Sequence, residues 1–467
     1  MLRKARLEHD LVGELPVPSR AYYGIHSLRA AENFPITGQR LPSALIRNLA
    51  RVKKACAMAN YSAGALPEEK AKAICQACDE IILGKWDDQF IVDPIQGGAG
   101  TSTNMNANEV IANRAIEILG GHLGDYAVVH PNDHVNCAQS TNDVYPTAIR
   151  MTLYEAADCL LDALDGLTAA LDERAAAFDQ ILTLGRTQLQ DAVPLRFGQI
   201  FSAYSAVMQR EKKRLDTARQ EMLCVNLGGT AVGTGLNASP GYLRHVITLL
   251  SEISGWPLYR SENCIDATQN ADSYVFLSSA LKSCGTSLSK ICSDLRLLSS
   301  GPQGGFGDIV LPARQNGSSI MPGKVNPVIP EVVNQIAFRL IGFDTTVTMA
   351  AEAGQLELNA FEPVIFDSLY QGCMQMAHGV ETLSAHCIRG IEVNQAHCMK
   401  LVRQSPSLVT AVSPFIGYME ACRLANEAQA THMTIQDLLV KHGMMTEKEA
   451  EEIMNLPALA EGLCAQK

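Results

Sequence analysis

Apolar residues recur every three or four positions over two long stretches in the middle of the chain. One stretch follows Pro146, and its apolar positions keep to one side of a helix: Ile149, Leu153, Ala156, Leu160, Leu164, Leu167 and Leu171. In the other stretch, steps of four and three alternate: Leu277, Leu281, Cys284, Leu288, Ile291, Leu295 and Leu298. A seven-residue apolar repeat is the packing pattern of long helices in bundles. Both stretches are therefore predicted to be long helices whose apolar seams face a core.

Three more long helices are predicted in this region, at about residues 195–223, 327–349 and 365–389, the last of which stops at Gly390. Their apolar faces are assigned to core packing, with no cofactor role. Long bundle helices with two opposed apolar stripes also favour oligomerisation.

Shorter elements flank this bundle. Helices are predicted at about residues 44–63 and 67–83, and another is entered at about Ala107. Residues 13–34 are predicted to be irregular because they contain a glycine and two prolines close together. We predict an all-α chain of three domains: an N-terminal domain at 1–141, a central bundle of long helices at 142–393 and a small helical domain at 394–467.

Composition limits the partners of this chain. Its 467 residues are 47% hydrophobic and 19% charged, with a net charge of −11 and no basic block, which argues against nucleic acid as a partner. No run approaches the ~20 apolar residues of a membrane span, and the N-terminus lacks the apolar core of a secretory signal. The 14 cysteines are scattered, as in a cytoplasmic protein with reduced thiols. Cys75 and Cys78 form a Cys-x-x-Cys, which we assign to helix packing rather than to redox or zinc chemistry.

The stretch from Asn316 to Pro327 is the strongest candidate for chemistry. It reads Asn-Gly-Ser-Ser-Ile-Met-Pro-Gly-Lys-Val-Asn-Pro, and its glycines and prolines allow successive N–H groups to turn toward one point. Ser318 or Ser319 would then lie in a field that favours an alkoxide. The spacing fits neither a phosphate-binding loop nor a nucleophile elbow. An ordinary surface turn is the open alternative, since these residues are the usual turn formers.

Four other polar stretches interrupt the apolar pattern. Residues 96–108 place three glycines before hydroxyls and amides at a predicted helix start, which suits an anion. Residues 140–143, Ser-Thr-Asn-Asp, form an N-cap cluster before the first long helix. Residues 185–191 and 226–237 are polar connections, the second of them a structural or site-lining loop. His130 and His134 are spaced like helical metal ligands, but the intervening residues indicate a loop.

The 316–327 stretch resembles the pattern Gly-Ser-Ser-x-Met-Pro-x-Lys-x-Asn of the fumarase/aspartase superfamily, and residues 96–108, 140–143 and 185–191 resemble that superfamily's motifs in the same order. The resemblance covers essentially the whole chain. It implies a helical homotetramer with shared active sites that eliminates ammonia or water from a small dicarboxylate, with fumarate as a product.

Residue by residue, the resemblance implies Ser318 as the general base, within a long segment that acts as a mobile lid. The substrate-binding residues that it implies are Thr101, Ser140, Thr141, Asn142, Thr187, Gln188, Ser319, Lys324 and Asn326. Gln188 stands where fumarases and some aspartases have a histidine, and glutamine cannot titrate. Glu362 stands where fumarases have a lysine. Arg29 has two open interpretations, a carboxylate ligand or a solvated surface arginine.

These departures from the fumarase pattern, with the N-terminal segment, favour elimination of ammonia from L-aspartate over hydration of fumarate. Two further alternatives are a catalytically silent protein that binds anionic metabolites and Schiff-base chemistry at Lys324. The favoured mechanism requires no cofactor and no metal, and a divalent cation activator stays open as an alternative.

Overall fold

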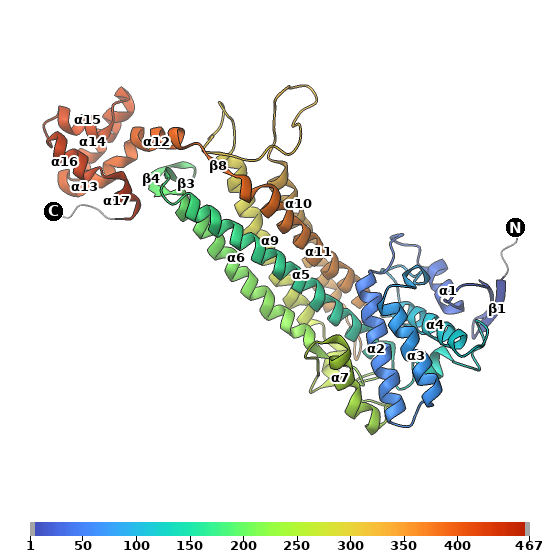
Figure 1. Cartoon of the computed structure of the whole chain (residues 1–467). Coiled ribbons are helices and arrows are strands. Elements are labelled where there is room, and N and C mark those ends of the chain that lie inside the picture. Colours follow the sequence, from blue (N-terminus) through green and yellow to red (C-terminus); the bar gives the residue numbers. More distant parts are fainter. Residues whose placement is uncertain (1–4, 463–467) are drawn as a thin grey trace. The chain divides into compact units, whose positions relative to one another are not determined.

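The structure, a computed structural model, describes residues 5–462, and the chain divides into two compact units (Figure 1). Unit 1 comprises the chain up to residue 161, residues 213–283 and residues 338–375. Unit 2 comprises residues 162–212, residues 284–337 and the chain from residue 376 onward. The three-domain division stays a prediction.

The five predicted long helices are present and contribute residues to both units. They are α5 (Thr141–Ala177), α6 (Phe197–Gln220), α9 (Asp272–Leu298), α10 (Val328–Glu352) and α11 (Glu362–His386). Every predicted seam residue of α5 is buried, as are those of α9 from Leu277 to Leu295. Removal of this apolar surface from water is the main force that holds such helices together. The predicted mostly helical fold is confirmed.

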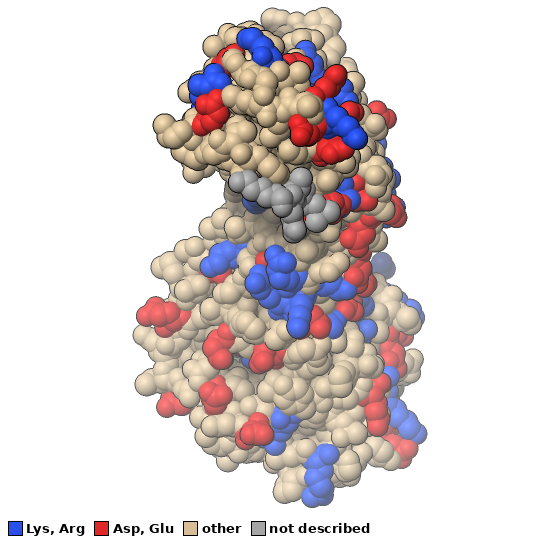
Figure 2. All heavy atoms as spheres, turned by 90° about the vertical axis from the view of Figure 1, so that its left-hand side faces the viewer, with Lys and Arg blue, Asp and Glu red and all other residues tan. Residues whose placement is uncertain are grey.

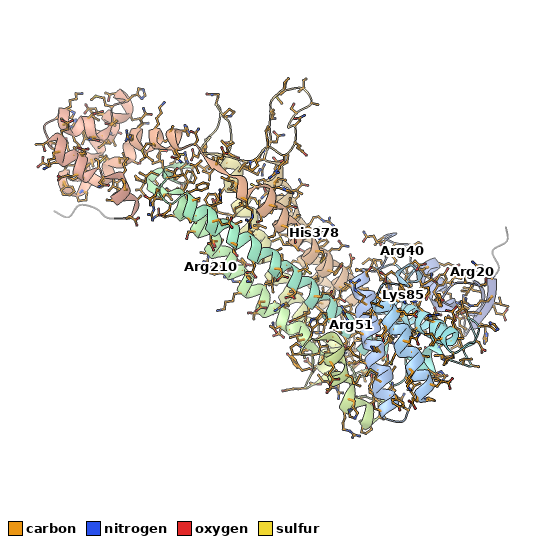
Figure 3. All side chains as sticks on the ribbon, in the orientation of Figure 1. Arg20, Arg40, Arg51, Lys85, Arg210 and His378 are labelled. Atoms are coloured by element: carbon orange, nitrogen blue, oxygen red, sulfur yellow. The ribbon has the colours of Figure 1, made fainter. Side chains whose placement is uncertain are left out.

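Unit 1 also contains six shorter helices within residues 5–283. They are α1 (Ile25–Asn33), α2 (Ser43–Ser62), α3 (Glu68–Ile82), α4 (Thr101–Ile118), α7 (Pro240–Ser254) and α8 (Cys264–Gln269), with short turns of helix at Asp87–Gln89, Pro131–Val135 and Glu221–Leu223. Helix α2 packs on α3 and α7. Arg51 of α2, labelled in Figure 3, lies over the ring of Trp256 at 5.5 Å from its centroid. This unit therefore confirms the helices predicted at 44–63 and 67–83.

Two predictions for the N-terminal region were wrong. Residues 13–34 are not irregular: β2 (Gly13–Pro18) pairs antiparallel with β1 (Ala5–Asp10), and α1 follows. Helix α4 begins at Thr101 rather than near Ala107. Gly100 precedes it with φ 86°, and a Cβ there would lie 2.4 Å from the ring of Tyr145. Only glycine fits this close approach, so packing against α5 sets the start of α4.

Unit 2 contains a hairpin, an irregular segment and a set of short helices. The hairpin is β3 (Leu182–Thr187) with β4 (Gln190–Arg196). Short paired strands also occur at Ile309–Val310 (β7) with Glu392–Val393 (β8), and in unit 1 at Cys224–Val225 (β5) with Tyr259–Arg260 (β6). The short helices are α12 (Gln395–Gln404), α13 (Val409–Ile416), α14 (Tyr418–Thr431), α15 (Ile435–Lys441), α16 (Glu447–Ile453) and α17 (Leu456–Ala460), with turns of helix at Ile388–Gly390 and Pro406–Leu408. A separate apolar core around Leu424, Leu438 and Leu439 holds α13 to α16 together.

The surface carries both signs of charge. On the face drawn in Figure 2, Lys and Arg side chains lie among Asp and Glu side chains. Across residues 5–462, no helix is long and apolar enough to cross a membrane.

Candidate active site

The Ser318 hydroxyl lies at the centre of a turn in the irregular segment before α10. Its Oγ accepts hydrogen bonds from the backbone N–H groups of Ile320, at 3.1 Å, and Met321, at 2.9 Å. The predicted convergence of N–H groups is therefore present, and it is directed at the first serine of the pair. N–H donors on an oxygen favour its charged form over the neutral hydroxyl.

The same loop is closed on itself. The Gly317 N–H donates to the Lys324 carbonyl at 2.7 Å, and Asn326 Nδ2 donates to the Gly317 carbonyl at 2.8 Å. A Cβ on Gly317 would lie 2.6 Å from the Lys324 oxygen, so this closure requires glycine. Ser319 and Lys324 are exposed and free to meet a ligand from outside.

A cavity of about 970 Å³ adjoins the second half of this loop. Its lining is more apolar than polar, and Lys324 and Arg296 make part of it cationic. All of its lining residues belong to unit 2. An anionic ligand of small size fits this chemistry.

Thr187 and Gln188 stand at the tip of the β3–β4 hairpin. Thr187 pairs with Gln190, so a two-residue turn connects the strands. Both turn residues, Gln188 and Leu189, have positive φ, at 52° and 62°. Such turns ordinarily use glycine or asparagine, and the strain of two bulkier residues is typical of functional positions. Within the described part of unit 2, no hydrogen bond joins this tip to the Ser318 loop.

The other predicted ligands belong to unit 1. Ser140 and Asp143 cap α5 reciprocally: Ser140 Oγ accepts from the Asn142 N–H at 3.2 Å, and Asp143 Oδ1 accepts from the Ser140 N–H at 2.9 Å. Asp143 Oδ2 also accepts from the N–H groups of Gly228 and Thr230, both at 3.0 Å. Burial raises the pKa of Asp143 to about 6. The 226–237 loop is thus fixed to the start of α5.

That loop also orients the amide of Asn142. Its Nδ2 donates to the Ala231 carbonyl at 2.8 Å. With the nitrogen bound in this way, Oδ1 is left as the free acceptor. An acceptor oxygen is what a substrate ammonium group requires.

Thr141 is oriented by a neighbouring amide of α4. Asn104 Nδ2 donates to Thr141 Oγ1 at 3.0 Å, so the threonine hydroxyl keeps its own proton for another acceptor. Thr101 is exposed at the first residue of α4. Three predicted hydroxyls, of Thr101, Ser140 and Thr141, thus stand at the starts of α4 and α5.

Some candidate residues are engaged elsewhere. Arg29 makes a two-point ion pair with Asp10, at 2.8 and 3.1 Å. Asn106, one of the amides of the 96–108 stretch, is buried and bonds to the backbone at Gln89 and Ile91. His134 accepts from the His130 N–H at 2.7 Å. Among the residues described, no three His, Cys, Asp or Glu side chains gather as a metal site, and the described cysteines, Cys75 and Cys78 among them, are free thiols.

Sequence reasoning missed Asn104, the role of Asp143 as a loop anchor, and the buried Lys53. A partial signal existed, because asparagines alternate at 104, 106 and 108 within a helix. Lys53 lies in an apolar helical run and resembled an ordinary surface lysine.

Glu362 is buried at the start of α11, and burial raises its pKa to about 8. The unfolded carboxyl titrates near 4.5. Between these values the folded protein holds a proton that the unfolded chain releases, so this group makes stability fall as pH rises from 4.5 to 8. Glu362→Gln should therefore gain roughly 5 °C in Tm relative to the parent between pH 5 and pH 9. Thermal unfolding at both pH values tests this; Glu357→Gln, at an exposed position, is the control, and a constant difference for Glu362→Gln contradicts the prediction.

Comparison with known proteins adds to this geometry. A family model described as Lyase matches residues 13–342, and a second, described as Fumarase C C-terminus, matches residues 408–461. An aspartate ammonia-lyase of Bacillus subtilis (strain 168) is 51% identical over 97% of this chain and 95% of its own length. One from Helicobacter pylori (strain ATCC 700392 / 26695) is 47% identical over 96% of each chain.

Two solved structures of lyases are similar to this chain in fold and in sequence. A fumarate lyase:delta crystallin from Brucella melitensis, bound to cobalt, has a TM-score of 0.95 at 47% identity and covers 98% of this chain and 99% of that one. A class II fumarase from Schistosoma mansoni has a TM-score of 0.94 at 32% identity and covers 98% of this chain and 99% of that one.

Proposed function

Because the chain belongs to the fumarase/aspartase superfamily of lyases, we infer that it is an aspartate ammonia-lyase, which eliminates ammonia reversibly from L-aspartate to give fumarate. The reaction removes a proton from the carbon next to a carboxylate and forms a doubly charged enediolate. The residue roles below are our proposal.

Ser318 is the base. The observation that carries this assignment is its Oγ, which accepts two backbone N–H bonds. These donors remain in place when the proton leaves, so they favour the alkoxide over the alcohol. The alkoxide takes the proton from the carbon, and the hydroxyl that results returns it to solvent after ammonia departs.

Neutral donors stabilise the enediolate. Thr101, Ser140, Thr141 and Ser319 each offer a hydroxyl proton, and fixed donors that face developing charge are the largest single contribution in many such sites. Thr187, Lys324 and Asn326 hold the other carboxylate, and the amine is received by Asn142 and Gln188.

Hydration of fumarate on the same scaffold is the alternative, because the S. mansoni fumarase shares this fold. Gln188 argues against it, since a glutamine cannot relay protons as the histidine of fumarases does.

The two activities separate in one assay. Fumarate absorbance should fall when protein and ammonium are both present, and stay constant when ammonium is replaced by an equal concentration of sodium or potassium. A decrease without ammonium indicates hydration instead. No change under either condition supports a protein that only binds anionic metabolites.

We also propose a homotetramer whose active sites combine groups of several subunits. Helix α10 supports it: within the single chain, Phe338 is 63% and Met349 is 67% exposed on that helix, with Ile341 also exposed between them. Apolar side chains of this size on a long helix are typical of a subunit interface. The proposed route uses no cofactor, a divalent cation activator stays open, and the cytoplasmic location inferred from the cysteines belongs to the same proposal.

A further inference from the structure

Lys53 is a fully buried lysine in unit 1, on α2, with 0% of its surface exposed. Its Nζ donates to Asn136 Oδ1 at 2.8 Å and to Gln139 Oε1 at 2.9 Å. Both partners are neutral amides, and no carboxylate of the described chain lies within ion-pair distance of it. The buried Asp143 carboxyl attracts this ammonium without forming an ion pair with it. A buried ammonium with no ion-pair partner costs stability that a methionine would not. Lysines in this situation are uncommon, and a functional reason is expected.

The partners of Lys53 lead to the substrate-binding hydroxyl. Asn136 Oδ1 also accepts from Asn104 Nδ2 at 3.3 Å, and the same Nδ2 group donates to Thr141 Oγ1 at 3.0 Å. Asn108 Nδ2 also donates a hydrogen bond to Asn136 Oδ1, at 3.3 Å. The network therefore connects α2, α4 and the start of α5 through side chains alone, and it ends at a hydroxyl whose proton points away from it.

Lys53 is predominantly protonated at neutral pH. Burial lowers its pKa to about 8, so the ammonium form predominates at neutral pH. Thr101, Ser140, Thr141 and Asn142 bring no charge of their own, and the Asp143 carboxyl at the same helix start attracts the Lys53 ammonium. The enediolate proposed above carries two negative charges. In a protein interior with little water, the electrostatic effect of a fixed positive charge extends along several hydrogen bonds, because little water screens it.

We propose that Lys53 is a positioning residue for ammonia elimination: through Asn136 and Asn104 its buried ammonium orients Thr141 as a hydrogen-bond donor and supplies positive charge beneath the enediolate. This inference rests on the proposed function. It does not require Lys53 to touch the substrate.

The test compares Lys53→Met with Lys54→Met in the full-length protein. Lys54 is the adjacent residue and pairs with Asp79 at the surface, so its variant should behave like the parent. Lys53→Met should lower kcat/KM for L-aspartate about 10- to 100-fold, less than the loss of a donor in direct contact with an oxyanion. If the parent protein itself fails to release ammonia, the proposed function fails; if the parent is active and Lys53→Met matches it, the inference fails.

A second readout separates charge stabilisation from structure. Succinate imitates the ground-state dicarboxylate, whereas the nitronate of 3-nitropropionate imitates the charge of the enediolate. Lys53→Met should lose about 10-fold more affinity for the nitronate than for succinate, as expected for an interaction that strengthens in the transition state. Equal losses for the two ligands overturn the inference, because a purely structural effect reduces both alike.

Asn104→Ala covers the case in which Lys53→Met does not fold. This variant leaves Lys53 with both of its amide partners and removes the Asn104 bonds to Asn136 and Thr141, so the network no longer reaches Thr141. Asn104→Ala should also lose more affinity for the nitronate than for succinate, and its Tm should be close to that of the parent. Asn104→Ala with parental kinetics and parental nitronate affinity overturns the inference.

Discussion

Ser318→Ala should lose at least about 1,000-fold in kcat, within the range that a positioned general base contributes. The hydroxyl is the group that accepts the Ile320 and Met321 N–H bonds, and alanine offers no oxygen to take the proton. Because the turn is on the surface, water replaces the lost acceptor, and the fold should be unaffected. Ammonia release from L-aspartate measures the effect.

The control for this variant is Ser254→Ala. Ser254 Oγ accepts from the Trp256 N–H at 3.2 Å, the same kind of local bond, in a turn that has no proposed role in the reaction. It should retain parental turnover. Size-exclusion chromatography should give the same assembly for the parent and both variants. Ser318→Ala with more than about a tenth of parental kcat would refute the base assignment.

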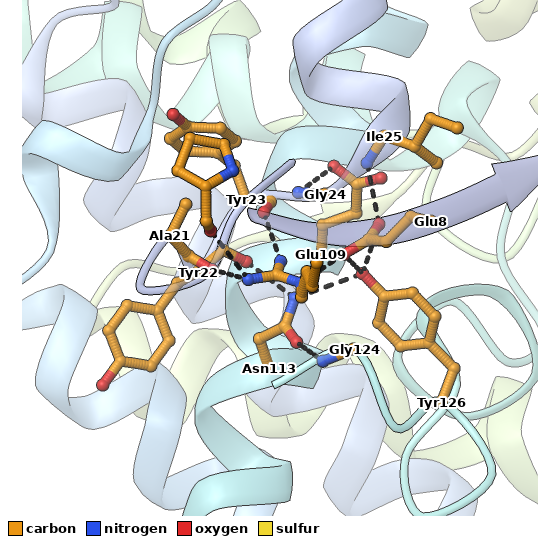
Figure 4. A network of polar contacts seen from close by, with 12 residues as sticks. Glu8, Ala21, Tyr22, Tyr23, Gly24, Ile25, Glu109, Asn113, Gly124 and Tyr126 are labelled. Atoms are coloured by element: carbon orange, nitrogen blue, oxygen red, sulfur yellow. Dashed lines mark hydrogen bonds and ion pairs between the residues drawn. The ribbon is translucent and has the colours of Figure 1, made fainter. Parts of the chain in front are cut away.

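Glu109→Ala should destabilise unit 1 by about 3–5 kcal/mol, the cost of leaving partners of a buried charge unpaired. The Glu109 carboxylate, drawn in Figure 4, accepts from the N–H groups of Gly24 at 2.8 Å, His26 at 2.8 Å and Ser27 at 3.1 Å, and from the Ser27 hydroxyl at 2.5 Å. These N–H groups are the open donors at the start of α1, which has no cap from its own N-cap residue. Without Glu109 the buried N–H groups of Gly24 and Ser27 lose their acceptor.

Urea unfolding measures this loss, and hydrogen exchange locates it. Amides of His26 and Ser27 should exchange faster in Glu109→Ala than in the parent. Glu117→Ala, on the same helix α4 but exposed, should cost no more than about 1 kcal/mol, as surface pairs do. Equal unfolding midpoints for the parent and Glu109→Ala would show that α1 does not depend on this cap.

Much of the fold could be predicted from the chain because helix periodicity is local. The apolar steps after Pro146 and from Leu277 identify α5 and α9, and their residues are buried as the pattern requires. The N-terminal segment could not be predicted in the same way. Gly13 to Phe34 contains turn residues, yet a strand partner and the Glu109 cap order it, and both come from other parts of the chain.

In the candidate site, too, features set by consecutive residues were predictable and those set by distant residues were not. The Ser318 loop was predictable as a convergence of N–H groups because its glycines, prolines and hydroxyls are consecutive residues. The start of α4 was missed by six residues, because Gly100 is fixed by the Tyr145 ring, which lies far along the chain. The hydrogen-bond network that orients Thr141 was missed for a related reason. Nothing in the sequence around Asn104 and Lys53 shows which residues they contact in the fold.

The sequence by itself determined the long helices and the family, because each depends on spacing between near neighbours or on a contiguous motif, and the proposed roles of the site residues rest on the same motifs. Only the tertiary structure decided where helices α1 and α4 begin, which hydroxyls have their protons free, and that Lys53 is buried among amides. Those features depend on hydrogen bonds between segments that folding brings together. The local sequence pattern does not show which distant group a polar side chain will bond.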